Sequence, residues 1–188
     1  MPLKYNNTAI ILHWLIALAL ILQLLGGIWM VEAINVEATK QTAYNFYQYH
    51  KSLGLVILVA SLLRLFWRLI HKVPPLPENM KLWEKFASHV SHILLYILMI
   101  AIPLLGWAMV SASSYGIPTR IFNLFELPHI SFLANSDNKL ELSKFFNKSH
   151  KLTAYMMIFL SLAHIGAALK HQFFDKNNLI QRMIPWKL

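Results

Sequence analysis

The sequence predicts an all-α fold: an integral membrane bundle of four helices, with both termini on the cytoplasmic side. Hydrophobic residues make up 57% of the 188-residue chain and charged residues only 13%, whereas soluble domains contain about 25% charged residues. The hydrophobic residues are gathered in four runs, and each run reaches the roughly 20 residues that a membrane-crossing helix needs. We expect spans at about 8–31, 50–70, 89–110 and 150–169, within a single domain over residues 1–188.

The first two spans follow from the hydrophobic runs. The run over 8–31 is too long for the hydrophobic region of a secretory signal and lacks a small-x-small cleavage site, so we interpret it as a retained helix. A polar and aromatic connection over 32–49 leads to the second span, which we expect to begin at His50 on the outer side. Three prolines within residues 74–77 then break the chain before the third span.

The third and fourth spans are joined by the longest connection. Pro103 lies inside the third span and is expected to kink it, because proline lacks a backbone donor and crowds the preceding turn. The connection over 111–149 is polar and aromatic, and near its end apolar residues alternate with Lys and Glu. This pattern predicts an amphipathic helical extension that leads into the fourth span and lies along the outer surface. Its apolar residues are Leu140, Leu142, Phe145 and Phe146.

The distribution of Lys and Arg predicts the orientation, because cytoplasmic connections carry an excess of these residues. On the side of the termini and the middle connection lie Lys4, Arg68, Lys72, Lys81, Lys85, Lys170, Lys176, Arg182 and Lys187. On the other side lie Lys40, Arg120, Lys139, Lys144 and Lys148. Both termini are therefore expected in the cytoplasm, with the longer connections in the periplasm of a bacterial inner membrane.

Charge and cysteine content exclude several classes of function. The net charge is +9, but the basic residues flank the apolar runs instead of forming one patch, so we expect no nucleic-acid binding. The chain has no cysteine, which excludes disulfides, thiolate catalysis, iron–sulfur clusters and covalent haem attachment. Any haem must be held without a covalent link.

Histidines recur at two depths of the predicted bundle. His150 and His164 are fourteen residues apart in the fourth span, which corresponds to about 21 Å along a helix and to nearly the same face. His13 matches the depth of His164 near the cytoplasmic surface, and His50 matches the depth of His150 near the outer surface. Because ionisable side chains inside membrane helices are costly and usually functional, the spacing predicts two stacked histidine pairs.

The pairs favour haem over other metal centres. Structural zinc takes four close ligands, often Cys or carboxylates, and none of these lies near the histidines. Two histidines from facing helices suit the axial positions of a b-type haem, so we expect two non-covalent haems. For a single membrane histidine, hydrogen bonding between helices or anchoring at the interface is the alternative. Glycines offer places where a macrocycle approaches the backbone: Gly26, Gly27, Gly54, Gly106 and Gly166.

The same residues carry a family resemblance that covers all four spans and the tail, with the connections as the poorest match. Its motifs are His13-Trp14, His50-Lys-Ser-Leu-Gly54 continuing to Arg64-Leu-Phe-Trp-Arg68, His89-Val-Ser-His92 leading to Ile102-Pro103-Leu-Leu-Gly106, and His150 through His164 to His171, ending in Asn178-Leu179 and Arg182-Met183-Ile184-Pro185. In these motifs the chain resembles the bacterial cytochrome b561 family of small di-haem membrane cytochromes.

This resemblance implies an activity and site residues. His13 and His164 would ligate the inner haem, and His50 and His150 the outer haem, which is the pairing that the spacing also predicts. The motifs are most similar to a superoxide oxidase of the family, which implies electron transfer from periplasmic superoxide through the haems to ubiquinone, with release of O2. His171, two turns after His164 on nearly the same face, would contact the quinone headgroup.

Basic residues on the outer side are candidates for attracting the superoxide anion, since a positive potential raises the local concentration of an anion. Lys51 and Lys151 directly follow the proposed outer ligands and, together with Arg120, are the expected catalytic residues. Lys144 and Lys148 would add to the positive potential. The alternative for the lysines is ordinary anchoring at the membrane interface.

Three further residues are expected at the haems. Arg64 lies inside an apolar span, where an uncompensated charge is expensive, so a haem propionate is its expected partner. Arg68, one turn later, either shares that partner or reaches the cytoplasmic surface. His92 lies near the inner depth and competes with His13 or His164 as a ligand; we interpret it as a neighbour of the haem or quinone.

Two other functions are compatible with this sequence. An electron-transfer subunit fed by a partner dehydrogenase or another redox protein would share the fold, and fold alone does not identify the electron donor. A histidine-lined metal transporter would need polar residues along a path at mid-membrane, and few lie between the two histidine layers.

Overall fold

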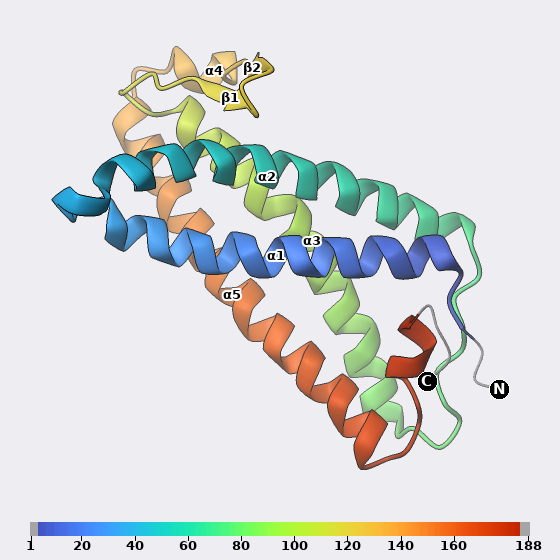
Figure 1. Ribbon diagram of the computed structural model, residues 1–188. Helices are drawn as coiled ribbons and strands as arrows, with labels where there is room; N and C mark the ends of the chain where they lie inside the picture. Colours follow the sequence, from blue (N-terminus) through green and yellow to red (C-terminus); the bar gives the residue numbers. More distant parts are fainter. Residues whose placement is uncertain (1–3, 185–188) are drawn as a thin grey trace.

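The computed structural model describes residues 4–184 and forms a bundle of four long helices (Figure 1). These helices are α1 (Asn7–Ala33), α2 (Glu37–Ile70), α3 (Leu82–Ser111) and α5 (Lys139–Phe173), and each is long and apolar enough to cross a membrane. The predicted four-helix membrane fold is therefore confirmed. Pro185 and Lys187, which entered the sequence motifs and the charge distribution, lie outside the described residues.

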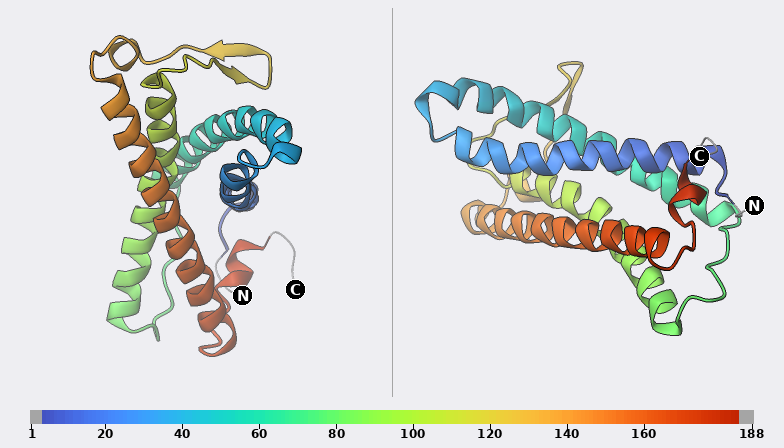
Figure 2. Two further views of the ribbon diagram at one scale, coloured as in Figure 1. Left: turned by 90° about the vertical axis from the view of Figure 1, so that its left-hand side faces the viewer. Right: turned by 60° about the horizontal axis from the view of Figure 1, so that its bottom comes forward.

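The four helices form two antiparallel pairs. Helix α1 packs against α2, α3 packs against α5, and contacts between α2 and α3 join the pairs. The two views of Figure 2 show the pairs crossing, with α3 and α5 side by side. Helix α1 does not pack closely against α5, so side chains that connect these two helices must reach across the space between the pairs.

The outer surface of the bundle is apolar. In the most apolar window of each helix, only 6% to 22% of the residues are buried inside the protein. On α1 the exposed residues include Leu15, Leu18, Leu22 and Leu25, each at least 55% exposed. Such a surface would be unfavourable in water, because each exposed apolar side chain lacks the roughly 1.5–3 kcal/mol of stabilisation that its burial would contribute. It is the surface expected of helices in lipid.

Two helices extend well beyond the predicted spans, which corrects the assignment of parts of 32–49 and 111–149 as connections. Helix α2 begins at Glu37, so His50 lies inside it and does not begin it. Helix α5 begins at Lys139, so the predicted amphipathic extension does lead into the fourth span, but as one continuous helix and not as a separate segment along the outer surface. Acidic residues in both first turns suit the helix dipole, and each pairs with a lysine three residues later.

A small hairpin covers the end of the bundle near His50 and His150, which is called the outer end below. Strands β1 (Thr119–Ile121) and β2 (Phe125–Leu127) pair antiparallel, and the short helix α4 (Ser131–Ala134) follows. The hydroxyl of Ser52, which is only 1% exposed, accepts a hydrogen bond from the Phe122 N–H at 3.0 Å and lies 3.1 Å from the Arg120 carbonyl oxygen. This buried hydroxyl therefore ties the hairpin to α2 close to His50.

The two ends of the described chain meet at the opposite end of the bundle (Figure 1). The Asn6 side chain caps α1 by accepting a hydrogen bond from the Ala9 N–H. The Tyr5 N–H and the Trp14 indole donate to carbonyls of Arg182 and Met183 in the 3-10 helix η1 (Ile180–Met183). The two described ends of the chain therefore lie at the same end of the bundle.

Candidate functional site

The histidines of the outer layer face each other from α2 and α5. The ring centroids of His50 and His150 are 6.3 Å apart, with an angle of 72° between the ring planes. Two imidazole rings that bind one metal from opposite sides, at metal–nitrogen distances of about 2.1 Å, have centroids roughly 6.4 Å apart. The outer rings therefore lie at the separation that axial ligation of one metal requires.

The histidines of the inner layer repeat this geometry from α1 and α5. The ring centroids of His13 and His164 are also 6.3 Å apart at 72°. Helix α5 thus contributes one histidine to each layer, fourteen residues or about 21 Å apart. The structure brings together both pairs that the sequence predicts.

An apolar layer separates the two histidine layers. Met157, midway between His150 and His164 on α5, is fully buried and packs with residues of the other helices. Its buried neighbours are Ile16, Tyr96, Leu98 and Met99. This layer keeps the two sites apart and does not favour the polar path that a metal transporter needs.

The ring nitrogens test whether a haem fits the pairs. His150 is held by a hydrogen bond from Nδ1 to the Ile102 carbonyl oxygen at 2.9 Å, which leaves Nε2 for a metal, as is usual for ligating histidines. The Nδ1 atoms of His13 and His50 are buried and have no protein partner among the described residues. All four rings are only half-buried in the protein itself. The donor set and spacing fit two bis-histidine b haems.

Two glycines make room for the outer rings. A Cβ at Gly106 would lie 3.2 Å from Cε1 of His150, and a Cβ at Gly27 would lie 3.3 Å from Cε1 of His50. From the sequence we expect these glycines to make room for the macrocycle, whereas in the structure they make room for the imidazole rings. Gly166 differs, since a Cβ there would meet nothing within 4 Å.

His92 lies closer to His164 than His13 does. The centroids of His92 and His164 are 5.3 Å apart, and His92 Nδ1 is hydrogen-bonded to the Ser88 carbonyl oxygen at 2.7 Å. The separation is about 1 Å shorter than two axial ligands of one metal require. The geometry therefore favours His13 as the partner of His164 and places His92 beside the inner site.

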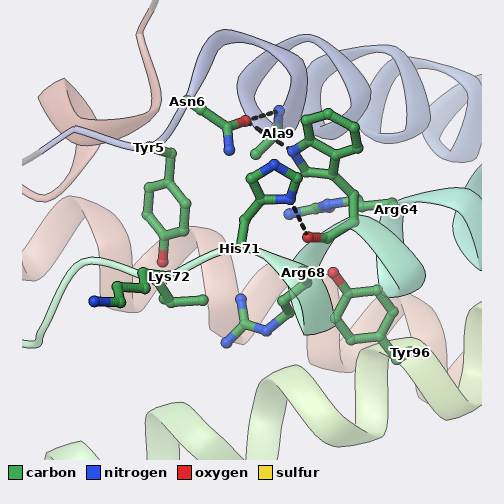
Figure 3. Close-up of a pocket in the computed structure, with 10 residues that line it drawn as sticks. Tyr5, Asn6, Ala9, Arg64, Arg68, His71, Lys72 and Tyr96 are labelled. Carbon is green, nitrogen blue, oxygen red and sulfur yellow. Dashed lines mark hydrogen bonds between the residues drawn. The ribbon is translucent and has the colours of Figure 1, made fainter.

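Arg64 and Arg68 point into one pocket at the inner end of α2 (Figure 3). The Arg64 guanidinium lies 5.8 Å from the ring centroid of Tyr96 and interacts electrostatically with the inner histidines. His71, which the sequence did not single out, directly follows α2 and stacks on Trp67, with the ring centroids 4.0 Å apart. The separation of Trp67 and His71 by four residues, about one helical turn, is the signal that would have found this pair. Two arginines, Lys72 and no carboxylate line the pocket, so it suits an anionic group.

The outer basic residues have different partners. Lys51 donates a hydrogen bond to the Pro118 carbonyl oxygen at 3.0 Å, and Arg120 forms an ion pair with Glu126 at 3.0 Å. Lys144 is paired with Glu141, while Lys148 and Lys151 are exposed. Lys51 and Arg120 thus hold the hairpin, and their charge is partly compensated within the protein.

His171 lies near the inner end of α5, in a cluster that the sequence analysis missed. It is only 8% exposed, and its Nδ1 is 2.5 Å from Oδ2 of Asp175. Lys170 connects Asp175 to Glu84 of α3. The separation of His171 and Asp175 by four residues was a usable signal, whereas Glu84 lies 86 residues from Lys170 and no local pattern connects them.

Comparison with known proteins agrees with this geometry. A family model described as prokaryotic cytochrome b561 matches residues 4–186. Two proteins of Escherichia coli (strain K12) are similar over nearly the whole chain: cytochrome b561 homolog 2 is 29% identical over 184 residues, 97% of this chain and 92% of that protein, and cytochrome b561 homolog 1 is 28% identical over 186 residues, 97% of each.

A third relative carries the name of an enzyme. The probable superoxide oxidase CybB of Yersinia pestis is 30% identical over 184 residues, which cover 98% of this chain and 97% of that protein. With the four membrane helices, these matches identify a multi-pass protein of the bacterial inner membrane. The chain belongs to the prokaryotic cytochrome b561 family of haem-binding electron-transfer proteins.

Proposed function

We propose that this chain is a di-haem oxidoreductase that takes electrons from periplasmic superoxide and delivers them to ubiquinone on the cytoplasmic side, releasing O2. The observation that carries the proposal is the presence of two histidine pairs with equal geometry, 6.3 Å at 72°, at two depths of one bundle. The similarity to a probable superoxide oxidase supports the electron donor. We assign this activity to a single domain over residues 1–188.

The four histidines would hold the cofactors as neutral imidazoles, His50 with His150 and His13 with His164. When bound, b haems supply reversible one-electron transfer, which the protein's own side chains cannot provide. The protein would contribute the four histidines that hold the haems and the apolar layer around Met157 that separates the two sites. Arg64 and Arg68, which point into a pocket without carboxylates, would pair with haem propionates.

The outer side chains would attract the anionic substrate. Lys151 is exposed, directly follows His150 and is the main candidate, with Lys148 nearby on the same helix. Lys51 and Arg120 remain candidates, but the hairpin partly compensates their charge. Lys51 donates a hydrogen bond to the Pro118 carbonyl oxygen, and Arg120 forms an ion pair with Glu126. Superoxide would therefore be drawn mainly toward the α5 side of the outer layer.

The inner side would complete the reaction. Two superoxide ions give two electrons and two O2 molecules, and one ubiquinone takes up these electrons and two protons to form ubiquinol. His171 would contact the quinone headgroup, and protons would enter from the cytoplasm. We propose cytoplasmic termini because Lys and Arg predominate at the end where both described ends of the chain meet.

Reduction of the purified protein tests the proposal. Haem content is determined first, and we expect two b haems per chain. The oxidised protein is then exposed to a superoxide-generating system with and without superoxide dismutase, and ubiquinone is added last. We expect haem reduction that dismutase abolishes, followed by ubiquinol formation. One haem per chain or none would disprove the ligand assignment.

A second candidate is an electron-transfer subunit that a partner dehydrogenase or another redox protein reduces. The partial compensation of Lys51 and Arg120 favours it, because it weakens the positive field available to a small anion. Two haems that stay oxidised with superoxide, but are reduced by membranes containing the partner, would establish this function instead.

A further inference from the structure

Four charged or titratable side chains meet at the inner end of the α3–α5 pair. Lys170 donates a hydrogen bond to Oε1 of Glu84 at 2.6 Å and to Oδ2 of Asp175 at 2.8 Å. The same Asp175 oxygen lies 2.5 Å from Nδ1 of His171. Glu84 also accepts a hydrogen bond from the Lys81 N–H at the start of α3. The cluster therefore connects two helices through a continuous series of hydrogen bonds.

Burial within the cluster is graded from inside to outside. His171 and Glu84 are each only 8% exposed, whereas the side chains of Asp175 and Lys170 are 30% and 46% exposed. A proton from the cytoplasmic water can thus reach Asp175 and Lys170 directly but cannot reach His171 as easily. The Lys170 ammonium lies between the two carboxylates and supplies the positive charge that a metal ion would otherwise bring.

The hydrogen bond to Asp175 determines what His171 can do. With Nδ1 engaged by a carboxylate, the ring is held in place and the other ring nitrogen, Nε2, is left to face a ligand. Glu84 from α3 and Asp175 after α5 interact electrostatically with His171, and Lys170 on α5 bridges these two carboxylates. Two carboxylates and one ammonium leave an excess of negative charge around the ring.

We propose that Asp175, held in place by Lys170 and Glu84, is a positioning residue that holds the His171 ring through Nδ1, so that Nε2–H serves as the proton donor to the reduced quinone. This inference rests on the proposed function only in that His171 contacts the quinone. For each proton delivered, the Nε2–H bond of His171 breaks and an O–H bond forms at a quinone carbonyl oxygen. The electrons come from superoxide or from another reductant, and water on the cytoplasmic side restores the proton to His171.

The charge state of Asp175 supports this role. Its hydrogen bond from Lys170 is the main cause that holds the pKa of Asp175 below its usual value. The carboxyl is therefore ionised at neutral pH and accepts a charge-assisted hydrogen bond from Nδ1 of His171. Replacing the carboxylate with an amide would weaken this hydrogen bond and the hold on the ring.

The test measures quinone-dependent reoxidation in the purified holoprotein. The haems are reduced with stoichiometric dithionite, mixed with a short-chain ubiquinone, and followed optically from about pH 5.5 to pH 9. For Asp175→Asn we expect unchanged haem content, a reoxidation rate at pH 7 that falls to about one tenth of the wild-type rate or below, and a pH profile of the rate that differs from the wild-type profile, because the charge beside the ring has been removed. Asp175→Glu should restore most of the rate.

A matched control separates this role from simple cross-linking of the helices. Glu78→Gln removes an exposed carboxylate at the same end of the bundle and should leave the rate and its pH profile unchanged. Glu84→Gln breaks only the α3 link, so it should lower thermal stability while keeping most of the pH profile. If Asp175→Asn lowers stability as Glu84→Gln does but keeps the wild-type pH profile, the cluster is structural and the inference is wrong.

Dithionite makes the test independent of the proposed electron donor. Superoxide that fails to reduce the wild-type haems would overturn only the donor, and the reoxidation assay would still decide the role of Asp175. A wild-type protein that ubiquinone cannot reoxidise would overturn both the quinone acceptor and this inference.

Discussion

The imidazole rings of His92 and His164 lie 5.3 Å apart, which is closer than the 6.3 Å between His13 and His164. Proximity alone would therefore point to His92 as the partner of His164. The distance that two axial ligands need, roughly 6.4 Å between centroids, favours His13 instead.

Substitutions of the two histidines should separate their roles. We expect His92→Gln to retain two haems per chain, because the His92 ring is held by Ser88 and lies too close to His164 to share a metal with it. His13→Ala should lose the inner haem and retain the outer one. Pyridine haemochrome assays of the purified variants measure both outcomes, and loss of a haem from His92→Gln alone would reassign the inner ligand.

The glycine that faces His150 should be needed for the outer haem. Gly106→Ala places a Cβ 3.2 Å from Cε1 of that ring, and such overpacking costs about 1–3 kcal/mol. We expect a lower content of outer haem or a shifted optical spectrum at that site. Gly166→Ala is the matched control for the outer haem, because its Cβ would meet nothing within 4 Å. Equal outer-haem content in both variants would contradict the prediction.

Ser52 should hold the outer hairpin in place. Ser52→Ala leaves the Phe122 N–H without its acceptor, and loss of a hydrogen bond of this kind costs about 0.5–1.5 kcal/mol. We expect faster hydrogen exchange over residues 118–127 and a lower thermal midpoint, while exposed Ser131→Ala should change neither. Unchanged exchange in Ser52→Ala would mean that other contacts hold the hairpin.

The exposed outer lysine should matter more than the paired arginine. Lys151→Gln should slow superoxide-driven haem reduction several-fold at low ionic strength, and the effect should fade as salt screens the charge. Arg120→Gln should have a smaller effect, because Glu126 already compensates that guanidinium. Stopped-flow rates over a range of salt concentrations measure both, and a larger effect from Arg120 would reverse the assignment.

The inner end of the α3–α5 pair should be sensitive to acid. The hydrogen bond from Lys170 lowers the pKa of Asp175 in the folded protein, so its contribution to stability is complete above the ordinary value of about 3.9 and is lost as the pH falls through the lowered value. Below about pH 4, we expect the thermal midpoint in detergent to decrease more steeply in the wild type than in Asp175→Asn. Parallel curves would show that Asp175 contributes nothing to the acid dependence.

The sequence by itself determined the four spans and the two depths of the histidines. Both depend on local properties: about 20 apolar residues suffice to cross the bilayer, and the fixed rise of a helix places His150 and His164 about 21 Å apart on one face. His13 and His50 then follow from their distance to the membrane surfaces. These predictions need no knowledge of how the helices pack.

Only the tertiary structure decided the features that join distant segments. Helix α2 begins at Glu37, before its apolar run starts, so hydropathy does not predict this first part of the helix. Gly27 and Gly106 lie against histidines of neighbouring helices, and Lys51 and Arg120 are engaged by the hairpin. Glu84 meets Lys170 across 86 residues. Hydropathy and helical periodicity describe one helix at a time, whereas these contacts arise from the packing between helices, which no local pattern encodes.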